Sequence, residues 1–143
     1  MFFKGQYHFL SNFYPCILRS WGMTFHSSEH LYVACKIPKE NMELRYHVSQ
    51  TTTAADAKRF GRVIDVRDDW DEIRVDVMRS ILLKKFSQSH LKELLLGVDK
   101  KIVEHNKWHD NFWGSCVCRN CGYKGENILG KLLEETKIIL EKP

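Results

Sequence analysis

Three short stretches of this 143-residue chain each place a carboxylate among aromatic side chains, and they lie far apart in the sequence. They span residues 27–32, 67–71 and 110–114. A carboxylate beside an aromatic ring can hold a flat base or a developing positive charge while a proton moves. This equipment suits the cleavage of a bond between a sugar and a base, so the sequence suggests an N-glycosidic reaction.

Turn residues, helix caps and apolar spacing predict the elements that must position these stretches. Residues 106–125 hold no periodic pattern and many special residues, which is typical of a functional loop. The expected elements are strands over residues 16–21, 23–25 and 102–103 and helices over residues 29–37, 53–60, 69–86, 91–96 and 128–140. This order predicts a single α+β domain over residues 1–143, mainly helical and with a small β-sheet.

The composition is that of an ordinary globular domain, with 43% hydrophobic and 28% charged residues. No apolar run reaches membrane-spanning length, and the N-terminus lacks the basic segment and cleavage site of a secretory signal. We therefore expect a cytoplasmic protein with no membrane partner. The net charge of +4 and the pI near 8.8 are compatible with phosphate-bearing partners but fall short of a dedicated nucleic-acid binder.

The chain resembles the NADAR family of YbiA-like N-glycosidases in motifs that cover nearly its whole length. The matching residues are 9–15, 28–30, 61–62, 85–86, 94–95, 113–114, 125–127 and 129–130, together with Lys36, Arg67, Trp70 and Asp110. The resemblance implies a YbiA-like fold and cleavage of the N-glycosidic bond of ribosyl compounds. It implies no cofactor, because this hydrolysis needs neither a metal nor a redox group.

Two acids are the predicted catalytic residues on the strength of this resemblance. Glu29 follows a serine N-cap, where an acid commonly complements the helix dipole. Asp110 lies in an Asn/Asp-rich loop, where an acid commonly makes turn hydrogen bonds. The resemblance instead implies that one acid protonates the leaving nitrogen while the other stabilises an oxocarbenium-like centre or orients water. The sequence leaves the division of these roles open.

Two aromatic residues and one amide are predicted to contact the base and the sugar. The resemblance implies that Trp70 stacks on the substrate, although its place in an apolar helical stripe equally fits core packing. Trp113 either lines the pocket or is buried under its loop. Asn12 either contacts the ribose or makes a turn hydrogen bond.

The predicted phosphate contacts come from side chains and from the backbone. Lys36, Arg62 and Arg67 are the candidate cations, because Arg in particular can clamp a phosphate with two parallel hydrogen bonds. Gly125 and Asn127 precede the last helix, where backbone N–H groups can approach an anion.

The five cysteines form an odd number without a secretory signal, which favours reduced thiols over disulfides. Three of them, Cys116, Cys118 and Cys121, lie where the family usually has a short glycine-rich stretch. A structural zinc needs four ligands, so one more of His105, His109, Cys16 and Cys35 would have to join them. No second Cys-x2-Cys pair is present, so unligated thiols are the favoured expectation and no metal is assigned.

The leading hypothesis is a hydrolase that cleaves the bond between C1 of a ribose phosphate or ADP-ribose moiety and a base-like nitrogen. Two substrate classes follow from the resemblance: ADP-ribosylated guanine, in DNA or as a nucleotide, and the ribosylaminopyrimidine phosphates of riboflavin synthesis. The basic surface slightly favours the first, which would make the protein a reverser of ADP-ribosylation. The alternatives are a non-catalytic module that binds ADP-ribose or NAD, and a zinc-stabilised loop that contacts nucleic acid. The oligomeric state is left open.

Overall fold

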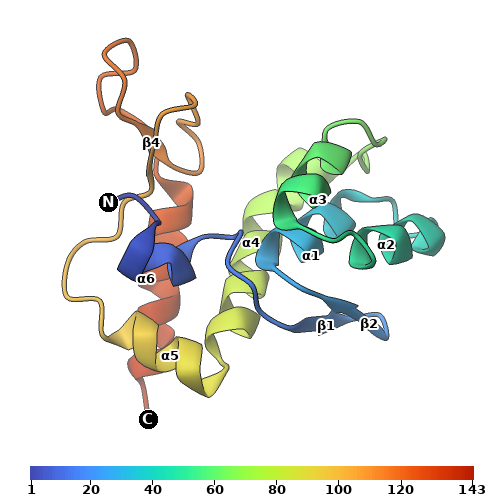
Figure 1. Ribbon diagram of the computed structural model, residues 1–143, viewed down its shortest axis with the longest axis horizontal. Coiled ribbons are helices and arrows are strands. Elements are labelled where there is room, and N and C mark those ends of the chain that lie inside the picture. Colours follow the sequence, from blue (N-terminus) through green and yellow to red (C-terminus); the bar gives the residue numbers. More distant parts are fainter. The chain divides into compact units, whose positions relative to one another are not determined.

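The computed structural model describes residues 1–143, which form two compact units. One unit comprises residues 12–85, and the other joins residues 1–11 to residues 86–143. Helices predominate, and the strands form two separate two-stranded sheets (Figure 1). The predicted α+β class is thereby confirmed, whereas the single domain over residues 1–143 stays a prediction. None of the helices combines the length and the apolar character that a bilayer crossing requires.

The unit of residues 12–85 begins with a β-hairpin and continues with helices. Its elements are β1 (Leu18–Ser20), β2 (Met23–Phe25), α1 (Ser28–Lys36), α2 (Met42–Ser49), α3 (Ala54–Gly61) and α4 (Trp70–Phe86), the last of which ends in the other unit. The predicted hairpin is confirmed, with β1 shorter than expected. Ser20 pairs with Met23 across a two-residue turn in which Trp21 has φ 53° and Gly22 has φ 71°. Two positive φ angles give the turn the twist that joins adjacent antiparallel strands.

Side-chain caps explain where the short helices begin. The side chain of Ser27 accepts a hydrogen bond from His30 N at the start of α1, and that of Thr53 accepts one from Asp56 N at the start of α3. Both helices were predicted from these residues, and both predictions are confirmed. The sequence did not predict α2, because its buried face is partly polar and lacks an apolar stripe.

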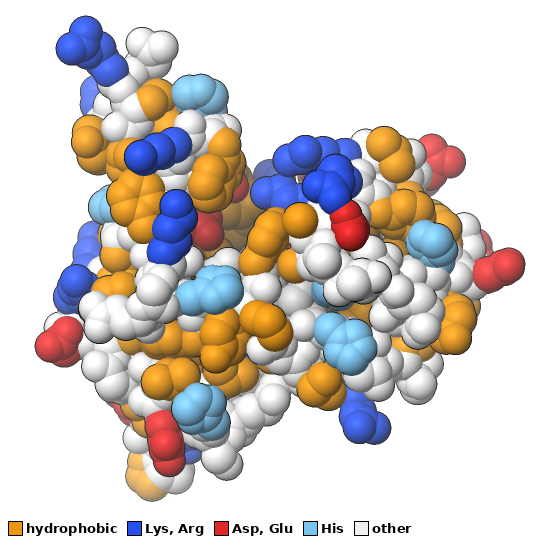
Figure 2. All heavy atoms as spheres, in the orientation of Figure 1, with side chains coloured by type: hydrophobic (Ala, Val, Ile, Leu, Met, Phe, Trp, Pro, Cys, Tyr) orange, Lys and Arg blue, Asp and Glu red, His pale blue; other side chains and the backbone are white.

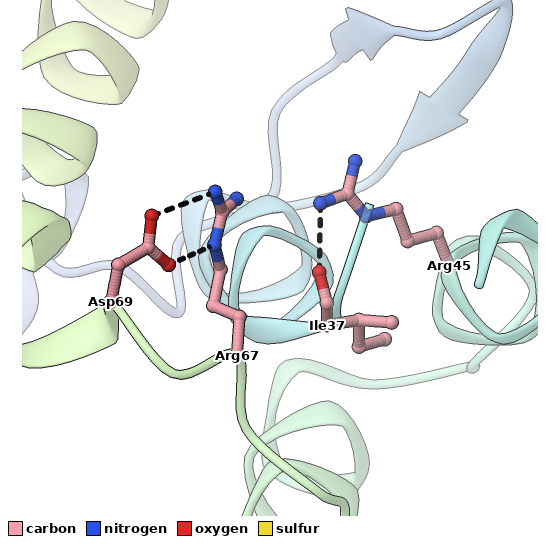
Figure 3. A network of polar contacts seen from close by, with 4 residues as sticks. All are labelled: Ile37, Arg45, Arg67 and Asp69. Atoms are coloured by element: carbon pink, nitrogen blue, oxygen red, sulfur yellow. Dashed lines mark hydrogen bonds and ion pairs between the residues drawn. The ribbon is translucent and has the colours of Figure 1, made fainter. Parts of the chain in front are cut away.

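The buried Arg45 ties α2 to the end of α1 and to the hairpin. Its Nη2 donates to the carbonyl of Ile37, the C-cap of α1, at 2.8 Å (Figure 3). Its guanidinium carbon lies 4.1 Å from the centre of the Trp21 ring, which is a cation–π contact. One arginine therefore fixes the C-terminal end of the helix that carries Glu29.

The unit of residues 1–11 and 86–143 holds the remaining elements. They are η1 (Gly5–Leu10), α5 (Ser89–Leu96), β3 (His105–Asn106), β4 (Ser115–Cys116) and α6 (Ile128–Glu141). β3 and β4 pair in parallel. The strand predicted at residues 102–103 is wrong: Ile102 N donates to Glu134 Oε1 at 2.8 Å, and Ile102 O accepts from Asn127 Nδ2 at 3.0 Å. Side chains satisfy this backbone, so it needs no strand partner.

Candidate active site

Glu29 lies in the first turn of α1, where neighbouring groups fix its backbone. Its N–H donates to the carbonyl of Asn12 at 3.0 Å. The next residue, His30, is buried; its Nδ1 lies 2.6 Å from Ser27 Oγ, and its Nε2 lies 2.9 Å from the carbonyl oxygen of Thr51. The histidine therefore anchors the start of α1 and holds the backbone of the acid in place.

The surroundings of the Glu29 carboxyl favour its protonated form. The side chain keeps some exposed surface, but burial in the protein raises its pKa above the ordinary value of 4.5. The positive charges of Lys58, Lys36 and Arg62 act in the opposite direction without cancelling this effect. A carboxyl that keeps its proton closer to neutral pH can act as a general acid.

Four cations act on Glu29 or on its neighbour Lys36. Burial lowers the pKa of Lys36, the charge of Glu29 raises it, and the charges of Lys58, Arg62 and Arg74 lower it. We call these five residues the Glu29 cluster. With four cations and one acid, the cluster carries an excess of positive charge that suits an anionic ligand.

Three helices bring the Glu29 cluster together. Glu29 and Lys36 lie on α1, Lys58 lies on α3 with Arg62 directly after it, and Arg74 lies on α4. α3 packs closely on α1 at Gly61, which has no side chain. A Cβ added there would lie 3.0 Å from Val33 Cγ2 of α1. Figure 2 shows Lys and Arg side chains gathered over α3.

Asn12, the predicted ribose contact, presents an unsatisfied acceptor beside the acid. Its carbonyl binds the N–H of Glu29, whereas its side-chain Oδ1 is buried and has no hydrogen-bond partner. Leaving a buried polar group unpaired costs about 1–3 kcal/mol, so such a group calls for an explanation. A hydroxyl group of a bound sugar would supply the missing donor.

Arg67 is committed to an ion pair, in contrast to Lys36 and Arg62. Its Nε and Nη2 donate to the two carboxylate oxygens of Asp69 at 2.6 and 3.1 Å (Figure 3). Its N–H donates to the carbonyl of Lys36 at 2.9 Å. The guanidinium thus forms an ion pair within its own loop, and the residue links the end of α1 to the start of α4. Phosphate binding by Arg67 stays a prediction.

Trp70 is the first residue of α4 and is packed in the interior. Its side chain is only 6% exposed, and its ring centre lies 5.0 Å from that of Tyr32 at an interplanar angle of 60°. The structure thus agrees with core packing, one of the two roles expected for Trp70 from the sequence. Stacking of the indole on a substrate stays a prediction.

Asp110 makes the local hydrogen bonds that its loop setting indicated. Its Oδ1 accepts from the backbone N–H groups of Phe112 and Trp113 at 3.1 and 3.0 Å. The Phe112 and Trp113 rings meet edge to face at 4.9 Å, and Trp113 is half-buried. One carboxylate oxygen of Asp110 therefore shapes the loop that carries Trp113.

The backbone donors predicted to bind an anion are used within the protein. Gly125 N donates to Ser115 Oγ at 3.1 Å, and Asn127 N donates to the carbonyl of Gly114 at 3.1 Å. Neither N–H group is left for a phosphate in this structure. Gly125 and Asn127 instead hold the end of the loop against residues 114 and 115.

The Asn127 side chain is also committed to the backbone. Its Oδ1 accepts from Glu104 N at 2.9 Å, and its Nδ2 donates to Ile102 O at 3.0 Å. The residue has the left-handed φ of 53° that Asn tolerates. It is therefore a structural clamp at the start of α6.

The sequence did not predict two residues of the Glu29 cluster, Lys58 and Arg74, and left a third residue, His109, as one of several candidate zinc ligands. Lys58 lies four residues before Arg62, the spacing of neighbours on one helix face, so an extended search from Arg62 could have found it. Arg74 carries no comparable signal. His109 lies among Cys116, Cys118 and Cys121; the sequence named it as one of four candidate partners and could not choose.

Comparisons with known proteins agree with the motifs. The NADAR domain family matches residues 1–141. The N-glycosidase YbiA of Escherichia coli (strain K12) is 34% identical over 139 residues, covering 94% of this chain and 82% of YbiA. A riboflavin biosynthesis protein of Vibrio vulnificus (strain YJ016) is 39% identical over 129 residues, which cover 87% of this chain, and the chain spans 33% of that protein. The NMR structure of the E. coli protein YbiA matches with a TM-score of 0.81 and 32% identity, covering 98% of this chain and 83% of that one. This chain therefore belongs to the NADAR family, as its motifs predicted.

Proposed function

We propose that this protein is a cytoplasmic N-glycosidase that hydrolyses the bond between C1 of a ribose phosphate or ADP-ribose moiety and a base-like nitrogen. The observation that carries the proposal is the Glu29 cluster, in which an acid of raised pKa lies among four cations. An acid able to donate a proton serves the leaving nitrogen, and the cations serve the phosphate. Relatives named N-glycosidases and a riboflavin biosynthesis protein support the same reaction class.

Glu29 is assigned the role of general acid. As the C1–N bond breaks, its electron pair stays on the nitrogen, which takes the proton of the Glu29 carboxyl. The sugar passes through an oxocarbenium-like state, and a water molecule then adds to C1. The proton that this water loses replaces the one given up by Glu29, so the carboxyl is restored for the next turnover. The Asn12 Oδ1 acceptor would bind a ribose hydroxyl while Lys36, Lys58, Arg62 and Arg74 hold the phosphate.

A product screen by mass spectrometry tests the proposal and separates the substrate classes. Wild-type protein is incubated with ADP-ribosylated guanine oligonucleotide and, separately, with a ribosylaminopyrimidine phosphate. We expect release of ADP-ribose from the first, because the Glu29 cluster suits a polyanionic ligand. Release of ribose 5-phosphate from the second alone would reassign the substrate. Binding of both without cleavage would support the non-catalytic module.

If Arg62 binds the substrate phosphate, its replacement should change KM only for a substrate that carries the phosphate. Arg62→Gln should raise KM for the phosphorylated substrate about 10-fold or more, since a hydrogen bond to a charged group contributes about 1.5–3 kcal/mol. The KM of the corresponding dephosphorylated riboside should not change. Steady-state kinetics on the two compounds measure this difference.

Arg59→Gln is the matched control for Arg62→Gln. Arg59 lies on α3 and pairs with Asp56 at the surface, with its side chain 66% exposed. Its removal should leave both KM values unchanged, because an exposed ion pair contributes little. Equal KM increases in the two variants would argue against a specific phosphate contact at Arg62.

The role proposed for Asp110, that of second acid, can be separated from its role in the loop. The amide oxygen of Asn can accept the same two backbone N–H groups. Asp110→Asn should therefore keep the wild-type melting temperature and lower kcat by about 10-fold or more. Asp110→Ala should lose both activity and stability. If kcat of Asp110→Asn equals that of wild type, Asp110 only shapes the loop and has no catalytic role.

A further inference from the structure

Three thiols surround one imidazole nitrogen in the loop of residues 106–125. His109 Nδ1 lies 3.6 Å from the Sγ of Cys116, 3.4 Å from that of Cys118 and 3.5 Å from that of Cys121. All four ligand atoms lie within 4.8 Å of one another. The residues come from a turn, a strand and the segment that follows it, so local sequence spacing alone does not account for this convergence.

The three nitrogen–sulfur separations match the corresponding edges of a tetrahedron around a single ion. Zinc binds thiolate sulfur at about 2.3 Å and imidazole nitrogen at about 2.0–2.1 Å, which places the nitrogen about 3.5 Å from each sulfur in a tetrahedral site. The three observed distances lie within 0.2 Å of one another and span this value. The ligands of a two-iron cluster would instead be divided between two metal atoms.

We propose that Cys116, Cys118, Cys121 and His109 bind one structural zinc ion that fixes the loop of residues 106–125. Three sulfur ligands and one nitrogen form a closed set of the kind found in structural zinc sites. The inference is independent of the proposed reaction, because the metal has no part in bond cleavage.

Among the four candidates for the fourth ligand, the structure selects His109. His105 Nδ1 lies 2.9 Å from the amino group of Met1. Cys16 and Cys35 are not members of the group whose ligand atoms all lie within 4.8 Å of one another. Among these residues, His109 alone presents a ring nitrogen to all three sulfurs.

The backbone around His109 is held in place without the metal. The buried Asn106 accepts from Trp108 N at 3.2 Å and from Asp110 N at 3.1 Å through Oδ1, and its Nδ2 donates to Asp110 O at 2.8 Å. These three bonds enclose His109, which has the unusual φ of 67°. A side-chain clamp that holds a ligand in a sparsely populated conformation supplies the outer support that metal sites need.

The sulfur side of the site is also supported. Cys116 is fully buried at the end of β4, and its N–H donates to Asn111 Oδ1 at 2.9 Å. Cys118 N donates to Cys116 Sγ at 3.5 Å, a contact that stabilises thiolate charge. Bound zinc would thus connect the turn before Asp110 to the segment after β4 (drawn in orange around the β4 label in Figure 1).

Metal analysis of the full-length chain tests the site directly. The protein is produced without a histidine tag, purified without chelator under reducing conditions, and analysed by inductively coupled plasma mass spectrometry. We expect about one zinc per chain. Cys118→Ser and His109→Ala should lose most of this zinc. Cys35→Ser, which removes a half-buried thiol outside the site, should keep it.

Cobalt substitution provides a second measurement on the wild-type chain, so the test does not depend on the folding of a variant. Titration of metal-free protein with cobalt(II) should give the intense visible bands of a tetrahedral site and sulfur-to-metal charge transfer in the near ultraviolet, saturating at one equivalent. Zinc should then displace the cobalt. Chelation should lower the melting temperature of wild type more than that of Cys118→Ser.

Three outcomes would overturn the inference. They are chelator-free protein that contains no zinc and gives no tetrahedral cobalt spectrum, a disulfide between two of the three cysteines found by peptide mass mapping, and stoichiometric iron with acid-labile sulfide. Each is distinguishable from a failure of the proposed reaction, because none is measured by turnover.

Discussion

Replacing Glu29 by Gln is expected to lower kcat by about 100-fold or more while substrate affinity stays within a few-fold of wild type. Positioned general acids contribute about 10²–10⁴ to a rate. Gln keeps the shape of the side chain and removes the proton that the leaving nitrogen requires. Single-turnover kinetics and equilibrium binding of the same riboside measure the two effects separately.

The raised pKa of Glu29 also predicts how kcat and stability should depend on pH. A general acid acts only while protonated, so wild-type kcat should fall as pH rises through the pKa of Glu29. Because folding raises this pKa above 4.5, the carboxyl contributes stability that is full below pH 4.5 and lost as pH rises through the folded pKa. Glu29→Gln removes that loss, so the variant should be at least as stable as wild type at alkaline pH.

Glu43→Gln is the matched control, because Glu43 is an exposed acid in the first turn of α2. It has the same relation to a helix dipole and no place in the Glu29 cluster. Its kcat should equal that of wild type. Equal turnover in wild type and Glu29→Gln would show that Glu29 is not catalytic. Binding without cleavage in both proteins would support the non-catalytic binding module.

Gly125→Ala is expected to cause the largest loss of stability among simple substitutions in the loop. A Cβ at this position would lie 2.3 Å from the carbonyl oxygen of Gly114 and 2.4 Å from Ser115 Cα. Both contacts are with backbone, which cannot rotate away as a side chain can. Overpacking of this kind costs about 1–3 kcal/mol and occasionally more, and we expect the upper end of that range. Urea unfolding monitored by circular dichroism measures the change.

Gly97→Ala provides the comparison, since Gly97 ends α5 with φ −79°. Its added Cβ would lie 3.4 Å from the carbonyl oxygen of Glu93, an ordinary contact. The free energy of unfolding should stay equal or rise by about 0.4–1 kcal/mol, because Ala restricts the unfolded chain. A Gly125→Ala variant as stable as Gly97→Ala would mean that the end of the loop is not packed against residues 114 and 115 as described.

Most helices could be predicted from the sequence because their signals are local. Ser27 and Thr53 begin α1 and α3 by side-chain capping, which depends only on residues three positions apart. α2 could not be predicted, since the residue that anchors it is Arg45, whose partners lie in other elements. The apolar Ile102 suggested a strand, but its backbone partners are side chains distant in the sequence.

In the candidate site, too, residues close in the sequence could be predicted to lie together, whereas contacts between distant residues could not. Glu29 and Lys36 lie on one helix and Lys58 and Arg62 four residues apart, so helical spacing accounts for part of the Glu29 cluster. Nothing in the sequence shows that Asp69 accepts hydrogen bonds from both Nε and Nη2 of Arg67, the residue predicted to contact phosphate. Three cysteines were evident as a group, but only folding selects His109 from the four candidate partners.

The crowding of cations around Glu29 has a consequence for the resting enzyme. The charges of Lys58, Arg62 and Arg74 act unfavourably on the charge of the half-buried Lys36, and salt screens such repulsion at a partly buried group only in part. If the proposed phosphate site is correct, a bound phosphate would relieve that repulsion and stabilise the fold by mass action, by about 1.4 kcal/mol for each tenfold rise in its concentration above Kd. The charges proposed to bind the substrate would then make the resistance of the protein to unfolding depend on whether that site is filled.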